Sequence, residues 1–168
     1  IPAREVKAML DNNGLKVSGT HALLSELDGD FGALVDYHHT IGNTNYIVPG
    51  APWDTKEGLD STIAKLNKYQ PMLAAEGITL AYHNHHGEFL PNKDGQIAHA
   101  EMEARTNVNF QIDTYWAFCG DRDPVETECG IMFQRIFREQ MFDDLGIHVE
   151  HVMSEQFGHT GNVPHFHR

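Results

Sequence analysis

The sequence has few cysteines, few basic residues and no long apolar run, and each scarcity narrows the range of functions. Two cysteines in 168 residues, Cys119 and Cys129, are too few for a disulfide framework, although one bridge between them would close a short loop. Lys and Arg number 12 against 24 Asp and Glu, a net charge of −12 with His neutral, so nucleic acid and anionic membranes are not expected partners. No apolar run approaches the roughly 20 residues of a membrane-spanning helix. A soluble protein is expected, with the cytoplasm favoured and the periplasm as the alternative if a signal has been removed.

Two further features are missing at the level of organisation. The chain begins at Ile1 without an initiator methionine or a signal-like segment, which predicts a processed or cut start. It also contains no low-complexity linker or charge run that would separate two domains. We therefore expect residues 1–168 to form a single domain.

Strand-like and helix-like segments alternate along the chain. Short runs rich in β-branched and aromatic residues predict strands at 15–20, 44–48, 78–82, 108–112 and 147–152. Amphipathic runs between them predict helices at 5–12, 27–40, 55–75, 97–105 and 133–144. Gly14, Gly77 and Gly146 each stand between a helical run and a strand, where a left-handed helix cap favours glycine. The first four strands recur about every thirty residues, as βα units of a parallel sheet do.

This alternation is compatible with an open doubly wound sheet or with a closed (β/α)8 barrel. The length favours the open sheet, because a closed barrel usually needs about 250 residues. The motifs disfavour an open nucleotide-binding sheet, since no GxGxxG follows the first strand and no GxxxxGK[ST] occurs. Both architectures place ligands at the carboxyl ends of the strands.

Histidine is abundant, with 12 in the chain, and three of them follow the third predicted strand as His83, His85 and His86. In an extended segment the first two side chains point to the same side, so two imidazoles could reach one cation. This cluster suggests a metal or acid–base site. The alternative is a polar loop whose imidazoles only form hydrogen bonds.

Two acidic residues stand at the ends of other predicted strands. Asp113 ends the apolar run 108–112, where a carboxylate must be hydrogen-bonded, paired or bound to a metal; it could also cap the turn that follows. Glu155 follows the fifth strand, and taken alone it is an ordinary surface acid. Together with imidazoles these acids would form a mixed oxygen and nitrogen site suited to Mn, Mg, Zn or Co.

Three other residues at the strand ends are candidates for contact with a small-molecule substrate: His21, Asn84 and Trp116. Trp116 and its neighbour Tyr115 could stack on a sugar ring, but aromatic residues next to a strand end also commonly belong to a core. Both interpretations remain open.

The residues around these positions resemble a known family. The segment 77–89, GITLAYHNHHGEF, resembles the G-I-x-L-x-Y-H-N-H-x-x-E-F signature of the sugar phosphate isomerase/epimerase group, the xylose-isomerase-like TIM barrels. The segment 113–126, from DTYWA to DPVE, is similar to that group's D-T-Y-W-x…G-x-D-P-V pattern. The similarity extends over about residues 1–126, and a looser likeness covers 130–156. It implies an α/β fold of the (β/α) barrel type.

This resemblance implies a divalent metal at the carboxyl ends of the strands and proton transfer next to a sugar carbonyl through an enediolate. Matched position by position, Asp113 and Glu155 fall on metal ligands of the group. His83 replaces a Glu that many relatives carry, and His85 and Glu88 fall on substrate-facing positions. We therefore predict His83, Asp113 and Glu155 as metal ligands and His85 or Glu88 as the acid–base group.

The resemblance also has gaps. The first strand of the barrel and the seventh, with its H-x-K-D motif, have no counterpart here, which predicts an incomplete barrel. Exposed strand edges would then need a cover such as a second copy of the chain. The expected function is a sugar or keto-sugar isomerase or epimerase, or a related dehydratase or lyase. The alternative is a non-catalytic carbohydrate- or metal-binding remnant or a subunit of a larger assembly. A phosphodiester-cleaving barrel is disfavoured by the acidic charge and by Val48-Pro49-Gly50, where that class has histidines.

Overall fold

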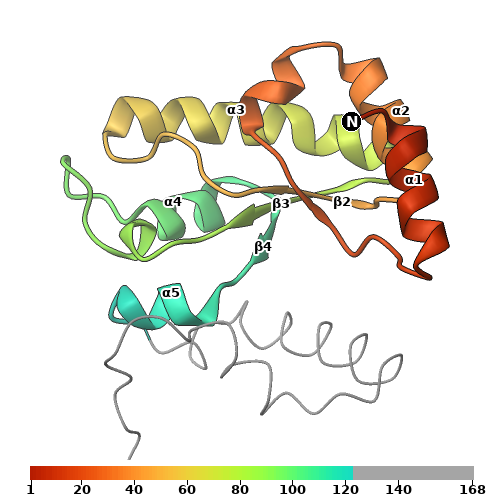
Figure 1. The fold of residues 1–168 in the computed structure, drawn as a ribbon. Coiled ribbons are helices and arrows are strands. Elements are labelled where there is room, and N and C mark those ends of the chain that lie inside the picture. Colours follow the sequence, from red (N-terminus) through yellow and green to blue (C-terminus); the bar gives the residue numbers. More distant parts are fainter. Residues whose placement is uncertain (123–168) are drawn as a thin grey trace, which may run out of the picture. The chain divides into compact units, whose positions relative to one another are not determined.

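Four parallel strands form one sheet in the part of the chain that the computed structural model describes, residues 1–122 (Figure 1). The strands are β1 (Thr20–His21), β2 (Asn45–Val48), β3 (Thr79–His83) and β4 (Asn109–Gln111). Their order in the sheet is β1-β2-β3-β4, so each new strand is added next to the preceding one. A barrel wall has this sequential order, whereas a doubly wound sheet reverses direction partway.

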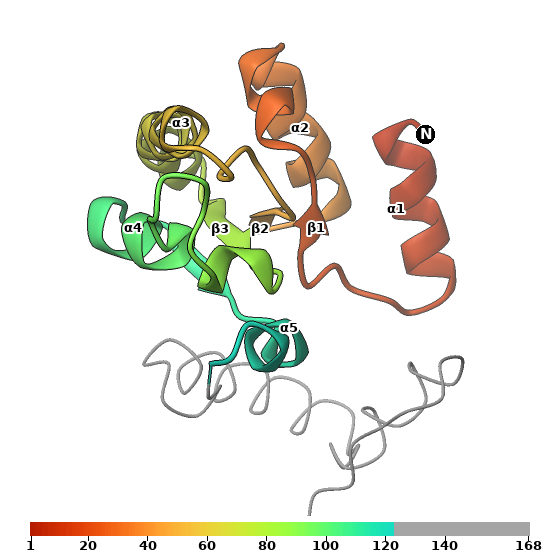
Figure 2. The same cartoon turned by 90° about the vertical axis from the view of Figure 1, so that its left-hand side faces the viewer.

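Helices follow or precede each strand. They are α1 (Ala3–Asn12), the 3-10 turn η1 (Leu24–Asp28), α2 (Phe31–Ile41), α3 (Lys56–Ala75), the 3-10 turn η2 (Gly87–Phe89), α4 (Ala98–Arg105) and α5 (Thr114–Cys119). Figure 2 shows α2, α3 and α4 arranged in an arc around one face of the sheet. Among residues 1–122, no helix combines the length and the apolar character needed to cross a bilayer.

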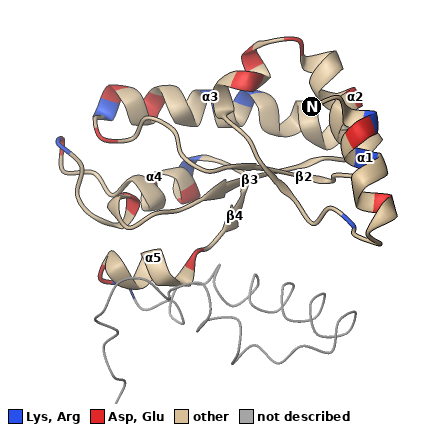
Figure 3. Cartoon of the chain, viewed as in Figure 1, with Lys and Arg blue, Asp and Glu red and all other residues tan. Residues whose placement is uncertain are grey.

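The two faces of the sheet differ because side chains alternate along each strand. Tyr46, Val48, Leu80 and Tyr82 belong to the core that the sheet shares with the helices. The residues between them, including His83, point to the opposite face, which would be the interior of a barrel. None of the strands contains Lys, Arg, Asp or Glu, and Figure 3 shows the charged residues on helices and loops.

Helix α3 provides most of the packing against the sheet. Thr55 caps its start by accepting a hydrogen bond from the backbone N–H of Gly58 at 3.2 Å. Leu59, Leu66 and Leu73, which lie seven residues apart, are fully buried. The predicted helix 55–75 is confirmed, and burying each of these side chains contributes about 1.5–3 kcal/mol to its packing.

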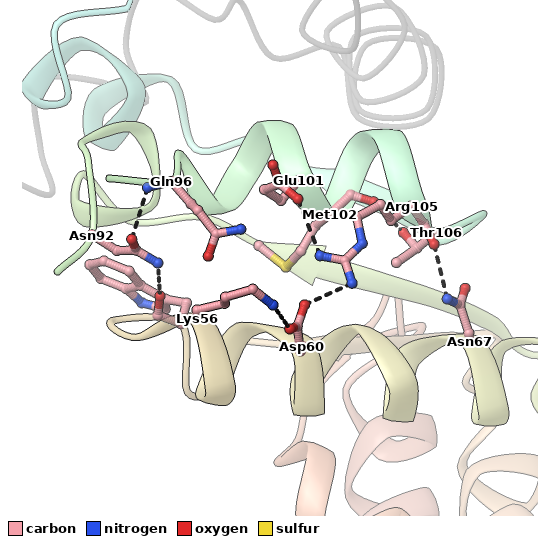
Figure 4. A network of polar contacts seen from close by, with 10 residues as sticks. Lys56, Asp60, Asn67, Asn92, Gln96, Glu101, Met102, Arg105 and Thr106 are labelled. Carbon is pink, nitrogen blue, oxygen red and sulfur yellow. Dashed lines mark hydrogen bonds and ion pairs between the residues drawn. The ribbon is translucent and has the colours of Figure 1, made fainter. Parts of the chain in front are cut away.

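A polar network joins α3 to α4 (Figure 4). The carboxylate of Asp60 pairs with Lys56 one turn earlier and, at 2.7 Å, with Arg105 of α4, whose guanidinium also contacts Glu101 at 3.2 Å. The amide of Asn67 donates to the backbone carbonyl of Arg105 at 2.9 Å. These contacts hold α4, and the loop before it, beside α3.

Two predicted elements differ from the structure. The predicted strand 15–20 is reduced to Thr20–His21; just before it, the carbonyl of Ser18 accepts from the side-chain amide of Asn45 at 2.7 Å and not from a backbone N–H of β2. The predicted helix 27–40 is divided into η1 and α2. Asp30 starts α2 by accepting from the backbone N–H of Ala33 at 3.0 Å, so the helix begins there.

The turns before β3 and β1 follow the prediction. Gly77 has φ of +70° and Gly14 has φ of +65°, both in the left-handed region that favours glycine. The predicted helix 133–144, the strand 147–152, Gly146 and Glu155 lie outside the described residues.

Candidate functional site

Side chains from three strands meet where the strands end, at the carboxyl end of the sheet. His21 ends β1, His83 ends β3 and Gln111 ends β4, and Asp113 follows β4 by two residues. Because the strands are parallel, all these ends lie at the same edge, where His83 is paired in register with Gln111. His21, His83 and Asp113 therefore lie at the same end of the described sheet.

Three imidazoles form a row along this edge. The ring centroids of His21 and His83 are 4.9 Å apart, and those of His83 and His85 are 5.1 Å apart. The side chain of His83 is 13% exposed and that of His85 is 44% exposed. His83 therefore lies deeper in the site, and His85 is open to a molecule arriving from solvent.

Gln111 connects two of these histidines and was not predicted from the sequence. Its Oε1 atom lies 2.6 Å from Nε2 of His21, and its side chain also favours the protonated form of His83. Side chains alternate between the two faces of a strand, so a residue paired in register with His83 points to the same face as His83. The pairing of Gln111 with His83 was therefore the signal that could have identified Gln111.

The environment of His83 favours its neutral form. Burial lowers the pKa of His83 most, the neighbouring imidazole of His21 lowers it further, and Asp113 opposes the change. The Nδ1 atom is buried and has no hydrogen-bond partner among residues 1–122. A neutral imidazole retains a lone pair on one ring nitrogen and can therefore ligate a metal ion.

Asp113 uses its two carboxylate oxygens differently. Oδ1 accepts a hydrogen bond from the backbone N–H of Trp116 at 3.0 Å and so caps α5. Oδ2 lies 4.0 Å from Nε2 of His83. The capping role foreseen as one interpretation of Asp113 is confirmed, and the second oxygen remains directed toward the histidines.

Asn84 follows His83 in the chain and contacts Asp113. It is fully buried, and its side-chain amide forms two hydrogen bonds with the main chain of Asp113: Nδ2 donates to the carbonyl at 3.1 Å, and Oδ1 accepts from the N–H at 2.9 Å. The residue predicted to contact substrate is thus engaged with the backbone of the next strand.

Glu88 lies behind His85. Its side chain is 2% exposed, and Oε1 is 4.0 Å from Nδ1 of His85. Oε2 accepts from the backbone N–H of His85 at 3.1 Å, and Oε1 accepts from the hydroxyl of Tyr82 at 3.1 Å. Burial and the Glu88 charge raise the pKa of Tyr82, which keeps its hydroxyl protonated as the donor.

Aromatic rings flank the same edge. Trp116 lies 5.6 Å, between ring centroids, from both His85 and His86. The ring of Trp53 covers Gly87 so closely that a Cβ atom there would lie 2.5 Å from the indole. Trp53 was not selected from the sequence, where nothing distinguishes it from a core tryptophan.

The donor atoms of His83 and Asp113 are of the types that bind divalent cations. Ligands of imidazole and carboxylate type bind at about 2.0–2.2 Å, so two atoms sharing one ion lie at most about 4.2 Å apart. The distance of 4.0 Å between His83 Nε2 and Asp113 Oδ2 is below that maximum but longer than the roughly 3–3.5 Å between adjacent ligands of one ion, so the two side chains would move closer on binding. Residues 1–122 contain no cluster of three or more His, Cys, Asp or Glu arranged to hold a metal. The described residues thus supply two candidate ligands, His83 and Asp113, and the third predicted ligand, Glu155, lies beyond them.

Comparison with known proteins identifies the family and the fold. A family described as "Xylose isomerase-like TIM barrel" matches residues 1–152. The chain belongs to this family. The predicted resemblance and the barrel-type fold class are therefore confirmed, and the sequential four-stranded sheet is part of such a barrel wall.

Two solved structures of the fold are similar. A sugar phosphate isomerase/epimerase from Parabacteroides distasonis has 25% identity and a TM-score of 0.65, over 75% of this chain and 52% of that one. A xylose isomerase domain containing protein from Salmonella typhimurium has 12% identity and a TM-score of 0.52, over 76% of this chain and 50% of that one, which supports the fold alone. The chain spans about half the length of these structures. No curated protein matches the sequence.

Proposed function

We propose that the protein is a divalent-metal-dependent sugar or keto-sugar isomerase or epimerase, or a related dehydratase or lyase. The observation that carries this proposal is the meeting of His83, Asp113 and the half-exposed His85 at the carboxyl edge of a barrel-type sheet. Membership of the xylose isomerase-like family and the name of the Parabacteroides neighbour support the same class of reaction.

The cation would be held by His83 and Asp113 together with Glu155. The neutral imidazole and the free carboxylate oxygen support this assignment, and their mixed donor set suits Mn, Mg, Zn or Co. When bound, such an ion polarises a carbonyl oxygen and stabilises the negative charge that develops as the adjacent proton leaves.

His85 would move that proton. It is more accessible than His83, and its main-chain N–H is fixed by the buried carboxylate of Glu88. Imidazole is the side chain most often used for general acid–base catalysis. Proton removal next to a carbonyl yields an enediolate, and return of the proton to the neighbouring carbon or to the other face gives isomerisation or epimerisation.

His21 and Trp116 would contact the sugar. Trp116 presents an aromatic ring 5.6 Å from the ring of His85, so a sugar held against it would place a carbon near the acid–base group. The ring of His21 lies next to that of His83, away from His85. It can donate a hydrogen bond to a sugar hydroxyl or accept one from it. The site thus suits a small polyhydroxylated molecule.

Solvent hydrogen exchange tests the proposal. The full chain loaded with Mn²⁺ is incubated in D₂O with a panel of ketopentoses and ketohexoses, free and phosphorylated, and deuterium incorporation is followed by NMR. We expect incorporation at a carbon next to the carbonyl of at least one sugar, lost in His85→Ala. His39→Gln is the control, because His39 bonds to the carbonyl of Glu76 at 2.8 Å at the opposite edge of the sheet.

The absence of exchange with every sugar would contradict the enzymatic proposal. Sugar or metal binding without exchange would instead favour the alternative of a non-catalytic binding protein.

A further inference from the structure

Asn84 forms a link between β3 and β4 beyond the point where their backbone ladder ends. The last register pair of these strands is His83 with Gln111. One residue later, the side-chain amide of Asn84 bonds to both the N–H and the carbonyl of Asp113, at 2.9 and 3.1 Å. The amide therefore takes the place of a further rung between the strands.

This link fixes the main chain of Asp113 from both sides. The Asp113 carbonyl also accepts from the backbone N–H of Ala117 at 2.9 Å, within the first turn of α5. Its Oδ1 atom is held by the N–H of Trp116 at 3.0 Å. With the backbone and one carboxylate oxygen fixed, the position of the other oxygen, Oδ2, is determined, and it lies 4.0 Å from Nε2 of His83.

Asn84 is at the same time inaccessible. Its exposure is 0%, and both polar atoms of its amide are bonded to protein. A substrate cannot reach it without opening these hydrogen bonds. Since Asn84 directly follows His83 in the chain, a single peptide connects one candidate ligand to the residue that orients the other.

We infer that Asn84 is a positioning residue for the cation site, which acts through the main chain of Asp113 and does not touch the substrate. The inference rests on the proposed function, because Asp113 must bind the ion for its position to matter. A partner that orients a ligand in this way typically contributes about 10–100-fold to metal affinity.

Three substitutions and one matched control separate this role from simple stabilisation. Asn84→Asp keeps the volume and the acceptor for the Asp113 N–H but places an oxygen against its carbonyl, and Asn84→Ala removes both bonds. Asp113→Asn removes the ligand charge itself. The control is Asn43→Ala, because Asn43 is also buried and its amide also bonds main chain, donating to the carbonyl of Asn45 at 3.0 Å and accepting from its N–H at 3.2 Å.

Mn²⁺ binding to the full chain is measured by calorimetry, and urea unfolding is measured in parallel without metal. Both Asn84 variants are expected to weaken Mn²⁺ binding by about tenfold or more. Asn43→Ala is expected to lower stability by a comparable amount while its Mn²⁺ affinity stays within about twofold of wild type. If Asn84→Ala does not fold, the nearly isosteric Asn84→Asp gives the decisive value.

Wild-type affinity in the Asn84 variants, with binding lost in Asp113→Asn, would overturn the positioning role and leave the proposed function intact. An equal loss of affinity in Asn43→Ala would also overturn it, since the effect would then follow stability. If wild type shows no Mn²⁺ binding that depends on Asp113, both this inference and the metal-dependent function fail.

Discussion

The Nε2 atom of His83 lies 4.0 Å from Oδ2 of Asp113, across the carboxyl ends of two adjacent strands. The distance is too long for a direct hydrogen bond, and a small inward movement, to about 3–3.5 Å, would let both atoms bind one ion as adjacent ligands. His83 is held by the strand ladder, and Asp113 is held by its own cap of α5 and by Asn84. The two side chains are thus held by different contacts, and the peptide between His83 and Asn84 connects them.

The two roles of Asp113 can be separated by substitution. Asparagine is as good a helix N-cap as aspartate, so Asp113→Asn should keep the fold close to wild-type stability. Asp113→Ala should lose the cap as well, at about 1 kcal/mol. We expect both variants to lose Mn²⁺ binding and only the alanine variant to unfold at lower urea concentration. Equal stability of the two variants would contradict the capping role, and retained binding in Asp113→Asn would contradict the ligand role.

Gly87 is required by the close approach of Trp53. A Cβ atom at position 87 would lie 2.5 Å from Cζ2 of that indole, so Gly87→Ala must displace the ring. We expect a destabilisation of about 1–3 kcal/mol and a shift of the Trp53 fluorescence. A Trp116→Phe background makes Trp53 the only tryptophan, since the chain has two.

Gly50→Ala is the matched control for this effect, because no atom lies within 4 Å of a Cβ at position 50. An unchanged emission spectrum in Gly87→Ala would show that the indole does not cover this turn.

His99 should make stability depend on pH. It is buried on α4, with ring centroids 4.5 Å from Phe89 and 4.8 Å from Phe110, and burial lowers its pKa to about 4. Because the ordinary value is near 6.5, the unfolded chain binds more protons than the folded chain between about pH 4 and 6.5. Stability therefore rises with pH through this window, by at most about 3 kcal/mol from this residue.

Urea unfolding of wild type and His99→Leu between pH 4.5 and 8 checks this effect. We expect wild type to lose more stability than the variant as the pH falls below 6.5, with a residual dependence because burial also lowers the pKa of His38. His39→Gln, at an exposed position, should behave as wild type. Parallel curves for wild type and His99→Leu would show that His99 is accessible to protons in the folded protein.

Much of the architecture could be predicted from periodicity and from the motif around β3. The helix 55–75 and the strands 44–48, 78–82 and 108–112 correspond to α3, β2, β3 and β4, because their apolar patterns are set by burial against each other. The short β1 was not predictable in the same way. The carbonyl of Ser18, just before β1, accepts from the Asn45 side chain, a contact between residues distant in sequence that no local pattern indicates.

Several residues that lie together at the candidate site were identified from the sequence, but their contacts were not. Strand alternation placed His83 and His85 near each other, and their rings lie 5.1 Å apart. Beyond the strand end alternation no longer applies, so the complete burial of Asn84 and Glu88 could not be foreseen. Gln111 was missed because an amide in a strand has no distinctive pattern until its register with His83 is known.

His83, Asp113 and Glu155 are proposed to bind one ion together. Calorimetric titration of the full chain with Mn²⁺, for wild type and for His83→Ala, Asp113→Asn and Glu155→Gln, tests this directly. One ion per chain in wild type and a loss of about tenfold or more in affinity in each of the three variants is the predicted result. Binding that survives all three substitutions, or no binding by the wild-type protein, would contradict it.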